Sequence, residues 1–230
     1  MIKKKAVVLL SGGIDSTTCL AIAVDAFGAD NVLALSMYYG QKHQKELECA
    51  KAVAEYYGVQ YIVQEISGAF DLSDCSLLQG REDIVHESYA EQLEKMGGEG
   101  TVATYVPFRN GLFLAYAAAI AVSVEASTIF YGAHADDAAG RAYPDCTPEF
   151  ERVMNLAIYE GSGRTVTLTA PLMYDNKAGV VKRGLKLGAP YHLTWSCYEG
   201  EDKPCGKCAT CLDRERAFRE NGVVDPLMEV

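Results

Sequence analysis

Residues 11–17, Ser-Gly-Gly-Ile-Asp-Ser-Thr, have the composition of a phosphate-binding loop. They follow a run of strand-forming residues at 6–10 and open a helical pattern that continues to about Phe27. The first turn of a helix has backbone N–H groups without intrahelical partners, and the helix dipole places partial positive charge there. A phosphate therefore finds ready hydrogen-bond donors at this turn.

Several features of this loop determine what it can bind. Gly12 and Gly13 let the main chain approach a ligand without an intervening Cβ, and three hydroxyl side chains add donors. The loop is not a Walker P-loop, because the chain has no Gly-Lys-Ser/Thr tripeptide. Asp15 lies among the expected phosphates, where a carboxylate is costly unless it holds Mg²⁺ or caps its own helix. The complete string favours a nucleotide site over an ordinary glycine turn.

Four cysteines near the C-terminus form a second motif that could do chemistry, Cys197 followed by Cys205, Cys208 and Cys211. Two residues between thiolates let a turn point both sulfurs at one ion, and Pro204 supplies turn chemistry. Four thiolates leave no open position for water, so we predict a structural Zn²⁺ site. An iron–sulfur cluster uses similar spacing and is the main rival. A disulfide pair would also use these residues, but it is unusual in a cytoplasmic chain.

Composition limits the partners and the compartment. The 230 residues include 21 Lys and Arg against 31 Asp and Glu, a formal net charge of −10, whereas a surface for a nucleic-acid backbone needs clustered positive charge. No run approaches the roughly 18 apolar residues of a membrane span. The apolar segment after the first lysines is too short for a signal peptide. We therefore expect a cytoplasmic protein with no direct nucleic-acid partner and no membrane partner.

Strand and helix patterns alternate along the chain, which predicts an α/β fold with a doubly wound, parallel five-stranded sheet. The predicted strands are residues 6–10, 31–37, 59–64, 128–132 and 166–169. After the first helix, the predicted helices are residues 43–57, 82–96, 111–125, a segment opened by Thr147-Pro148-Glu149, and residues 176–188.

This fold class also predicts where the site lies and how the chain is divided. Ligands of such sheets bind beyond the carboxyl ends of the strands, which places Ser11, Tyr38 and Gln41 on one rim. Residues 1–190 are assigned to the main domain, in which the loop at 11–17 would bind a nucleotide. The polar, glycine-punctuated residues 67–104 are an insertion placed to cover its site. Residues 191–230 form a small zinc-binding C-terminal knuckle.

Two further segments carry side chains that could choose a substrate. Arg109 and Asn110 precede a predicted helix, where a carboxylate or phosphate would find donors; for Arg109 alone, a surface ion pair is an equally good explanation. Tyr143 offers an aromatic face beside the acceptor Asp145, which suits a purine-like base, although an ordinary turn explains this pair about as well. Asp137 either binds Mg²⁺ or begins a solvated loop.

Six motifs occur in order across nearly the whole chain. They are Ser-Gly-Gly-x-Asp-Ser-Thr at 11–17, Tyr-Gly-Gln at 39–41, Tyr-Val-Pro-x-Arg-Asn at 105–110, Tyr-Pro-Asp-Cys at 143–146, Leu-Thr-Trp-Ser-Cys-Tyr at 193–198 and Cys-x-x-Cys-x-x-Cys at 205–211. The first resembles the loop of the N-type ATP pyrophosphatases. Together the six resemble the 7-cyano-7-deazaguanine synthases, the QueC family, whose fold is of the adenine nucleotide alpha hydrolase type.

The resemblance implies a specific reaction in queuosine biosynthesis. ATP adenylylates the carboxylate of 7-carboxy-7-deazaguanine, and ammonia displaces AMP to form an amide. A second activation, of the amide oxygen, gives the nitrile 7-cyano-7-deazaguanine (preQ0). ATP, Mg²⁺ and Zn²⁺ are the implied cofactors. Free ammonia is the expected nitrogen source because a chain of this size has no room for a glutaminase domain. A homodimer is the implied assembly.

The same resemblance assigns roles to residues at matching positions. The catalytic set is Asp15, Arg109 and Lys177, of which Lys177 would neutralise charge on the phosphates. The ATP-binding set is Leu10, Ser11, Gly12, Gly13, Asp15, Ser16 and Thr17. The substrate-binding set is Tyr39, Gln41, Tyr105, Arg109, Asn110, Asp137, Tyr143 and Asp145. The metal set is Cys197, Cys205, Cys208 and Cys211.

The sequence departs from the family pattern near the expected base pocket. Phe108 stands where the family commonly has a small residue, and the loop 134–142 carries Arg141-Ala142 as an apparent insertion and lacks the usual Asn and Ser. The altered loop supports a second hypothesis, a paralogue that stops at the amide or couples it to another amine. An iron–sulfur tRNA thiolase and a non-catalytic nucleotide-binding regulator are two more hypotheses. The acidic charge opposes the thiolase, and the presence of Asp15 and Lys177 opposes the regulator.

Overall fold

The computed structural model describes residues 3–41, 45–66, 68–78, 86–200 and 202–227. Its centre is a sheet of five parallel strands in the order β3-β2-β1-β4-β5. The strands are β1 (Ala6–Leu9), β2 (Val32–Tyr38), β3 (Gln60–Glu65), β4 (Thr128–Phe130) and β5 (Thr167–Thr169). The predicted parallel five-stranded sheet is confirmed, with each strand within a few residues of its expected place.

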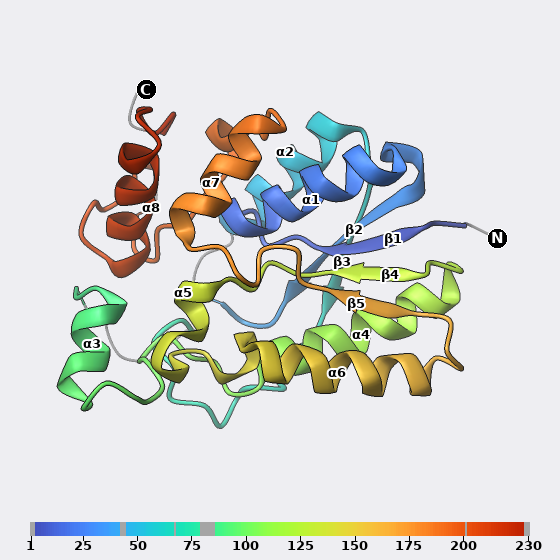
Figure 1. The fold of residues 1–230 in the computed structure, drawn as a ribbon, viewed down its shortest axis with the longest axis horizontal. Coiled ribbons are helices and arrows are strands. Elements are labelled where there is room, and N and C mark those ends of the chain that lie inside the picture. The colour runs from blue at the N-terminus through green and yellow to red at the C-terminus, as the bar shows by residue number, and fades with distance from the viewer. Residues whose placement is uncertain (1–2, 42–44, 67, 79–85, 201, 228–230) are drawn as a thin grey trace.

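Helices cover both faces of this sheet (Figure 1). One face carries α1 (Ile14–Phe27), α2 (Lys45–Tyr57) and α7 (Lys177–Lys186), and the other carries α4 (Arg109–Ser123) and α6 (Pro148–Gly161). The central strand β1 alternates between the two cores, because Ala6 and Val8 pack on the α1 side and Val7 on the α4 side. A strand buried on both faces explains why β1 is apolar throughout.

Side chains at the helix starts explain several boundaries. Asn176 caps α7 by accepting the N–H of Gly179, and Thr147 caps α6 by accepting the N–H of Phe150. The helix predicted for residues 82–96 is shorter in the described residues: α3 (Tyr89–Lys95) begins after Ser88, which forms a capping box with Glu91. The predicted helix start at His43 and the residue Glu82 lie outside the described residues.

Short helices connect the longer elements, and three of them follow the carboxyl end of β4. They are η1 (Ala29–Asn31), α5 (Ala135–Ala138), η2 (Ala139–Arg141), η3 (Pro144–Cys146) and η4 (Tyr191–Leu193). Four of the five follow β4 or α7, so the segments that leave these elements turn at once instead of extending into solvent. This keeps residues 134–146 close to the phosphate-binding loop.

The C-terminal residues include a helix that the sequence patterns did not predict, α8 (Ala209–Glu220). Figure 1 shows α8 beside α7. Phe218 is buried in the same core as Val180. Arg214 forms a buried bidentate ion pair with Asp225 (2.6 and 2.8 Å) and donates to Thr194 at 2.9 Å. These contacts fix the cysteine-bearing segment to the body of the sheet domain.

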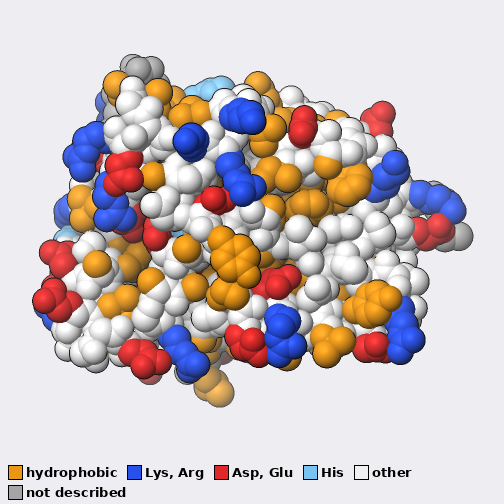
Figure 2. All heavy atoms as spheres, in the orientation of Figure 1, with side chains coloured by type: hydrophobic (Ala, Val, Ile, Leu, Met, Phe, Trp, Pro, Cys, Tyr) orange, Lys and Arg blue, Asp and Glu red, His pale blue; other side chains and the backbone are white. Residues whose placement is uncertain are grey.

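The surface is mixed in charge on the face that Figure 2 shows. Lys and Arg side chains are interspersed with Asp and Glu, and acidic side chains gather over α3, where Glu87, Glu91 and Glu94 lie together. On this face the described residues present no continuous basic band of the kind that holds a nucleic-acid backbone. Among the described helices, none has the length and apolar character needed to cross a membrane.

Candidate functional site

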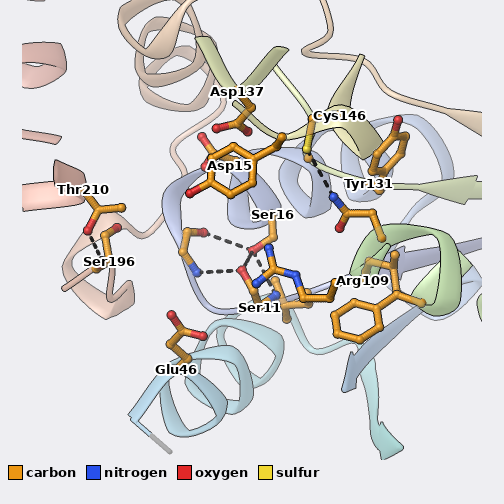
Figure 3. A pocket seen from close by; sticks show the side chains of 18 of the residues that line it. Ser11, Asp15, Ser16, Glu46, Arg109, Tyr131, Asp137, Cys146, Ser196 and Thr210 are labelled. Atoms are coloured by element: carbon orange, nitrogen blue, oxygen red, sulfur yellow. Dashed lines mark hydrogen bonds between the residues drawn. The ribbon is translucent and has the colours of Figure 1, made fainter. Parts of the chain in front are cut away.

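A cavity of about 260 Å³ lies at the carboxyl edge of the sheet, where parallel α/β sheets bind ligands. Its walls come from the ends of β1, β2 and β4, from the starts of α1, α2, α4 and α7, and from residues 195–213. Figure 3 shows Asp15 and Asp137 on one side of the cavity and Glu46 on the opposite side, with Ser11 and Arg109 between them. The predicted residues that line it are Leu10, Ser11, Gly13, Asp15, Ser16, Tyr39, Gln41, Arg109, Asn110, Asp137, Tyr143 and Lys177.

The phosphate-binding loop is closed by its own hydroxyl groups. The Ser16 hydroxyl accepts the Ser11 N–H at 3.1 Å and donates to the Gly13 carbonyl at 3.2 Å. Gly13 is the N-cap of α1 and provides no side-chain acceptor, so the N–H groups of the first turn remain available to a ligand. Trp195 donates its backbone N–H to the Gly12 carbonyl at 2.9 Å, which ties the C-terminal segment to the loop.

Two residues of the predicted ATP-binding set lie behind the loop rather than in the cavity wall. Gly12 has φ +88°, and a Cβ there would lie 2.2 Å from the Glu46 carbonyl oxygen. Close packing against α2 therefore requires this glycine. Thr17 is fully buried, and its hydroxyl has no partner among the described residues. The structure thus places Gly12 and Thr17 as supports beneath the other loop residues.

Asp15 and Lys177, which are 162 positions apart, meet at the cavity. The Lys177 Nζ lies 2.6 and 2.8 Å from the two carboxylate oxygens of Asp15. Burial acts to raise the pKa of Asp15, but the charges of Lys177 and His134 outweigh it and hold the pKa below its usual range. Burial likewise acts to lower the pKa of Lys177, but the charges of Asp15 and Asp137 outweigh it and raise the pKa above its usual value. The pair is therefore charged at neutral pH.

His134 joins this pair to a second carboxylate. Its Nε2 lies 3.3 Å from Asp137 and 3.7 Å from Asp15, while its Nδ1 is buried and unpaired among the described residues. Burial raises the pKa of Asp137, and His134 opposes that shift. Two carboxylates beside the loop form a donor set that suits Mg²⁺, which binds through one or two carboxylates and the substrate phosphates. Asp15 and Asp137 fit this requirement.

Arg109 supplies a second fixed positive charge at the start of α4. Its guanidinium donates to the Tyr39 hydroxyl at 3.1 Å. Burial acts to lower the pKa of Arg109, but Tyr39 and Asp145 outweigh it and raise the pKa above its ordinary value. Asn110 lies beside it, and its backbone N–H donates to Asp145 at 2.8 Å. Both residues line the cavity at the N-terminus of α4.

Two residues of the predicted substrate-binding set support α4 instead of lining the cavity. Asp145 is buried and accepts the Asn110 N–H, which occupies one of its oxygens at the start of the helix. The Tyr105 hydroxyl accepts the Phe108 N–H at 2.9 Å. Both residues hold Arg109 and Asn110 in place.

Two departures from the family pattern, Phe108 and Arg141, lie outside the cavity wall. Phe108 has φ +55°, a backbone conformation that favours small residues. Its side chain packs against Phe150, with ring centroids 6.0 Å apart, and a Cβ on Gly111 would lie 2.4 Å from its ring. Arg141 is largely exposed and lies 3.6 Å from Glu99. Neither side chain contributes to the cavity wall.

Glu46 is a cavity residue that the sequence patterns did not single out. It lies in the first turn of α2, where an acid is ordinary for a helix start. Burial raises its pKa to about 7, and Arg109 opposes that shift. The signal that could have found it is its place five residues after Gln41, which ends the Tyr-Gly-Gln motif. Further lining residues outside the predicted site sets include Tyr89, Trp195, Ser196, Tyr198, Thr210 and Asp213.

The four predicted metal ligands converge at one point. The sulfur atoms of Cys197, Cys205, Cys208 and Cys211 all lie within 4.8 Å of one another. A single tetrahedral zinc ion with bonds of about 2.3 Å separates its sulfurs by roughly 3.8 Å, close to the 4.0 Å between Cys205 and Cys211. A multi-iron cluster spreads its thiolates farther apart. Three backbone N–H groups donate to the Cys197 sulfur, as expected for a thiolate.

Comparison with protein families and curated relatives gives matches over nearly the whole chain. The model of the family "Queuosine biosynthesis protein QueC" matches residues 5–222. A 7-cyano-7-deazaguanine synthase from Archaeoglobus fulgidus is 44% identical over 225 residues, covering 97% of this chain and 90% of that protein. The Thermoplasma acidophilum protein of that name is 43% identical, covering 99% of this chain and 92% of the relative.

Solved structures show the same fold at low sequence identity. NMN synthetase from Francisella tularensis superposes with a TM-score of 0.51 at 17% identity, covering 99% of this chain and 82% of that one. The U34-tRNA thiolase NcsA from Methanococcus maripaludis, solved with its [4Fe-4S] cluster, also gives a TM-score of 0.51, at 15% identity, covering 96% of this chain and 68% of that one. With the match over residues 5–222 and the identities above 40%, the chain belongs to the QueC family.

Proposed function

We propose that this chain is an ATP-dependent carbon–nitrogen ligase that converts 7-carboxy-7-deazaguanine and ammonia to 7-cyano-7-deazaguanine, in queuosine biosynthesis. The observation that carries the proposal is the Lys177–Asp15 pair, 2.6 Å apart, at the open N-terminus of α1 in a chain of this family. That arrangement combines backbone donors, a fixed positive charge and a carboxylate at one phosphate-binding site.

The reaction uses two activations, and each bond change can be assigned. A carboxylate oxygen of the substrate attacks the α-phosphorus of ATP, and pyrophosphate leaves. Ammonia attacks the acyl carbon, AMP leaves with that oxygen, and a proton is released. The amide oxygen then attacks the α-phosphorus of a second ATP, and pyrophosphate leaves. Loss of AMP and of both amide protons yields the nitrile. Adenylylation is needed because carboxylate and amide oxygens are poor leaving groups.

The chain's own residues divide this work. The first-turn N–H groups of α1 and the hydroxyls of Ser11 and Ser16 bind phosphate oxygens, and Lys177 offsets the charge on the departing pyrophosphate. Arg109 faces the cavity from the start of α4 and orients an anionic group, and Asn110 lines the cavity beside it. When bound, Mg²⁺ held by Asp15 and Asp137 would neutralise phosphate charge. When bound, Zn²⁺ held by the four cysteines would stabilise the C-terminal segment.

Free ammonia as the nitrogen donor and a homodimer as the assembly complete the proposal, as the family resemblance implies. The paralogue that stops at the amide is not favoured. Its only support in the sequence is the altered loop 134–142, and the side chain of Arg141 in this loop is largely exposed and lies outside the cavity wall.

Mass spectrometry of the reaction products tests this function. Purified protein with 7-carboxy-7-deazaguanine, ammonium, Mg²⁺ and ATP should yield the nitrile and two AMP per nitrile. Amide as the final product, with one AMP each, would identify the paralogue. Absence of both AMP and product would reject the substrate assignment. Light scattering on a size-exclusion column tests the dimer, and glutamine in place of ammonium tests the nitrogen source.

A further inference from the structure

Three tyrosines from distant parts of the chain meet at the cavity. Tyr89 comes from α3 in the insertion, Tyr143 precedes η3, and Tyr198 follows the metal-binding residue Cys197. The hydroxyls of Tyr89 and Tyr198 lie 2.7 Å apart, Tyr143 donates to Tyr89 at 3.1 Å, and Thr104 lies 2.6 Å from the Tyr143 hydroxyl. All three tyrosines line the cavity. We refer to them as the tyrosine wall.

The wall is uncharged, unlike the rest of the site. Burial raises the pKa of the Tyr89 and Tyr143 hydroxyls, that of Tyr143 to about 12, so both stay protonated at neutral pH. The hydroxyls are hydrogen-bonded to one another, which leaves ring carbons to form the cavity surface. The Tyr89 and Tyr143 rings pack edge to face, with centroids 5.7 Å apart. Such a surface suits a planar ring system and not a triphosphate.

The positions of two wall residues depend on the segments that carry them. Tyr198 lies between Cys197 and Glu199, and the Glu199 N–H donates to the Cys197 sulfur. Tyr89 is the first residue of α3, directly after the N-cap Ser88. The same two segments meet a second time, where His86 lies 2.7 Å from the Glu199 carboxylate. We call residues 195–213, which carry the four cysteines, the cysteine segment. The insertion and the cysteine segment therefore hold the wall together from two sides.

We propose that Tyr89, Tyr143 and Tyr198 form the stacking surface for the bicyclic base of the acceptor substrate. This inference rests on the proposed function and adds that the insertion and the cysteine segment recognise the base, while Lys177 and the loop of α1 recognise ATP. The charged side of the cavity thus binds ATP, and the uncharged side binds the base. The sequence motif at 143–146 predicts a role for Tyr143, whereas Tyr89 and Tyr198 are assigned by their positions in the fold.

Calorimetric titrations without turnover test the wall. Wild-type protein and variants are titrated with 7-carboxy-7-deazaguanine in the absence of ATP, and separately with ATP and Mg²⁺ in the absence of the base. Tyr198→Leu and Tyr89→Leu keep apolar volume but remove the ring, whereas Tyr198→Phe and Tyr89→Phe keep the ring. Tyr116→Ala, at a partly exposed position on α4 outside the cavity, is the control.

The expected pattern separates base binding from ATP binding. The Leu variants should bind the base about 10-fold more weakly or worse, the range of base–aromatic stacking measured by truncation, and should bind ATP within about 2-fold of wild type. The Phe variants should stay close to wild type for both ligands, and the KM for the base should rise in the Leu variants more than kcat falls. Metal content of each variant, measured by elemental analysis, checks that the cysteine site is intact.

Two outcomes would overturn the proposal, and they are distinguishable from failure of the proposed function. Unchanged base affinity in both Leu variants would show that the rings do not stack the base. Equal weakening of ATP and base would assign the wall to adenine or to general packing. If wild-type protein itself did not bind the base, the proposed function would fail together with this inference.

Discussion

The pairing of Lys177 with Asp15 defines the site at the scale of single residues. The lysine is largely buried, with a side chain 15% exposed, and its charge is balanced by one carboxylate. A phosphate entering the cavity therefore meets a lysine already positioned and desolvated, which makes its charge more effective than it would be in water.

Replacing this lysine should remove much of the activity without unfolding the chain. Lys177→Ala is expected to lower kcat/KM for ATP at least about 100-fold, because a preorganised charge at the reacting phosphates is lost. Lys182 lies on the same helix but is exposed, so Lys182→Ala should leave kcat/KM within about 2-fold of wild type. Steady-state AMP release measures both. Equal activity in the two variants would contradict the assigned role.

Glu46 makes stability depend on pH. Its pKa is about 7 in the folded chain, above the usual 4.5 of Glu. Between these values the unfolded chain loses its proton while the folded chain keeps it, so this residue lowers the free energy of unfolding as pH rises from about 4.5 to 7. Glu46→Gln cannot ionise and should gain stability relative to wild type across this range.

Thermal denaturation at several pH values measures this effect. The difference in Tm between Glu46→Gln and wild type should grow from about pH 5 to about pH 7.5, with zinc present throughout. Glu48→Gln, an exposed acid on the same helix, serves as the control and should show a smaller change with pH. A constant difference for Glu46→Gln would show that Glu46 ionises normally in the folded chain.

At the scale of elements, the loop and α2 depend on each other. Gly12 approaches the backbone of Glu46 and Ala50, where an added Cβ would lie 2.2 and 2.8 Å from backbone atoms. A Cβ on Gly13 would come no closer than 3.5 Å to its neighbours, and Gly13 has φ −85°. The two adjacent glycines therefore serve different purposes, the first in helix packing and the second at the ligand.

A matched pair of substitutions tests this distinction. Gly12→Ala should lower the free energy of unfolding by about 2 kcal/mol or more, because it adds a backbone clash to a left-handed conformation. Gly13→Ala should cost clearly less stability and act mainly on ATP affinity. Urea denaturation and ATP titration separate the two effects. Similar stability of the two variants would mean that α2 moves freely to accept the new Cβ.

Elements were predictable where one signal dominated. Apolar runs predicted the five strands, and the glycine turn before α1 predicted the phosphate site, because burial and backbone geometry leave few other conformations there. The helix α8 was missed because half of its 12 residues are charged and it buries only a stripe that includes Ala217 and Phe218. Asp145 and Tyr105 carry side chains suited to a ligand, but the tertiary structure uses both to hold the start of α4.

At the scale of the whole molecule, the cysteine segment supports the active cavity. Trp195, Ser196 and Thr210 line the cavity, and the Trp195 N–H holds the Gly12 carbonyl. The cysteine spacing predicted that the four sulfurs meet, but it could not show that the segment carrying them closes the nucleotide site, since that contact joins residues far apart in the chain.

Loss of the metal should therefore affect both stability and ATP binding. Cys208→Ser is expected to lower metal content below one ion per chain, to reduce Tm by several degrees and to weaken ATP binding, because the knuckle releases the loop at Gly12. Cys49→Ser, outside the four-sulfur cluster, should retain one zinc per chain. Elemental analysis, calorimetry and ATP titration provide the three readouts. Unchanged ATP affinity after complete metal loss would show that the knuckle does not support the loop at Gly12.

The most direct test of the proposed synthesis is oxygen transfer from the carboxylate to AMP. With both carboxylate oxygens of 7-carboxy-7-deazaguanine replaced by ¹⁸O, each of the two AMP molecules formed per nitrile should carry one ¹⁸O, because both oxygens leave as phosphate oxygens. Mass spectrometry of AMP and of the base reads this in one experiment. AMP without label, or labelled AMP at one per amide and no nitrile, would contradict the proposed synthesis.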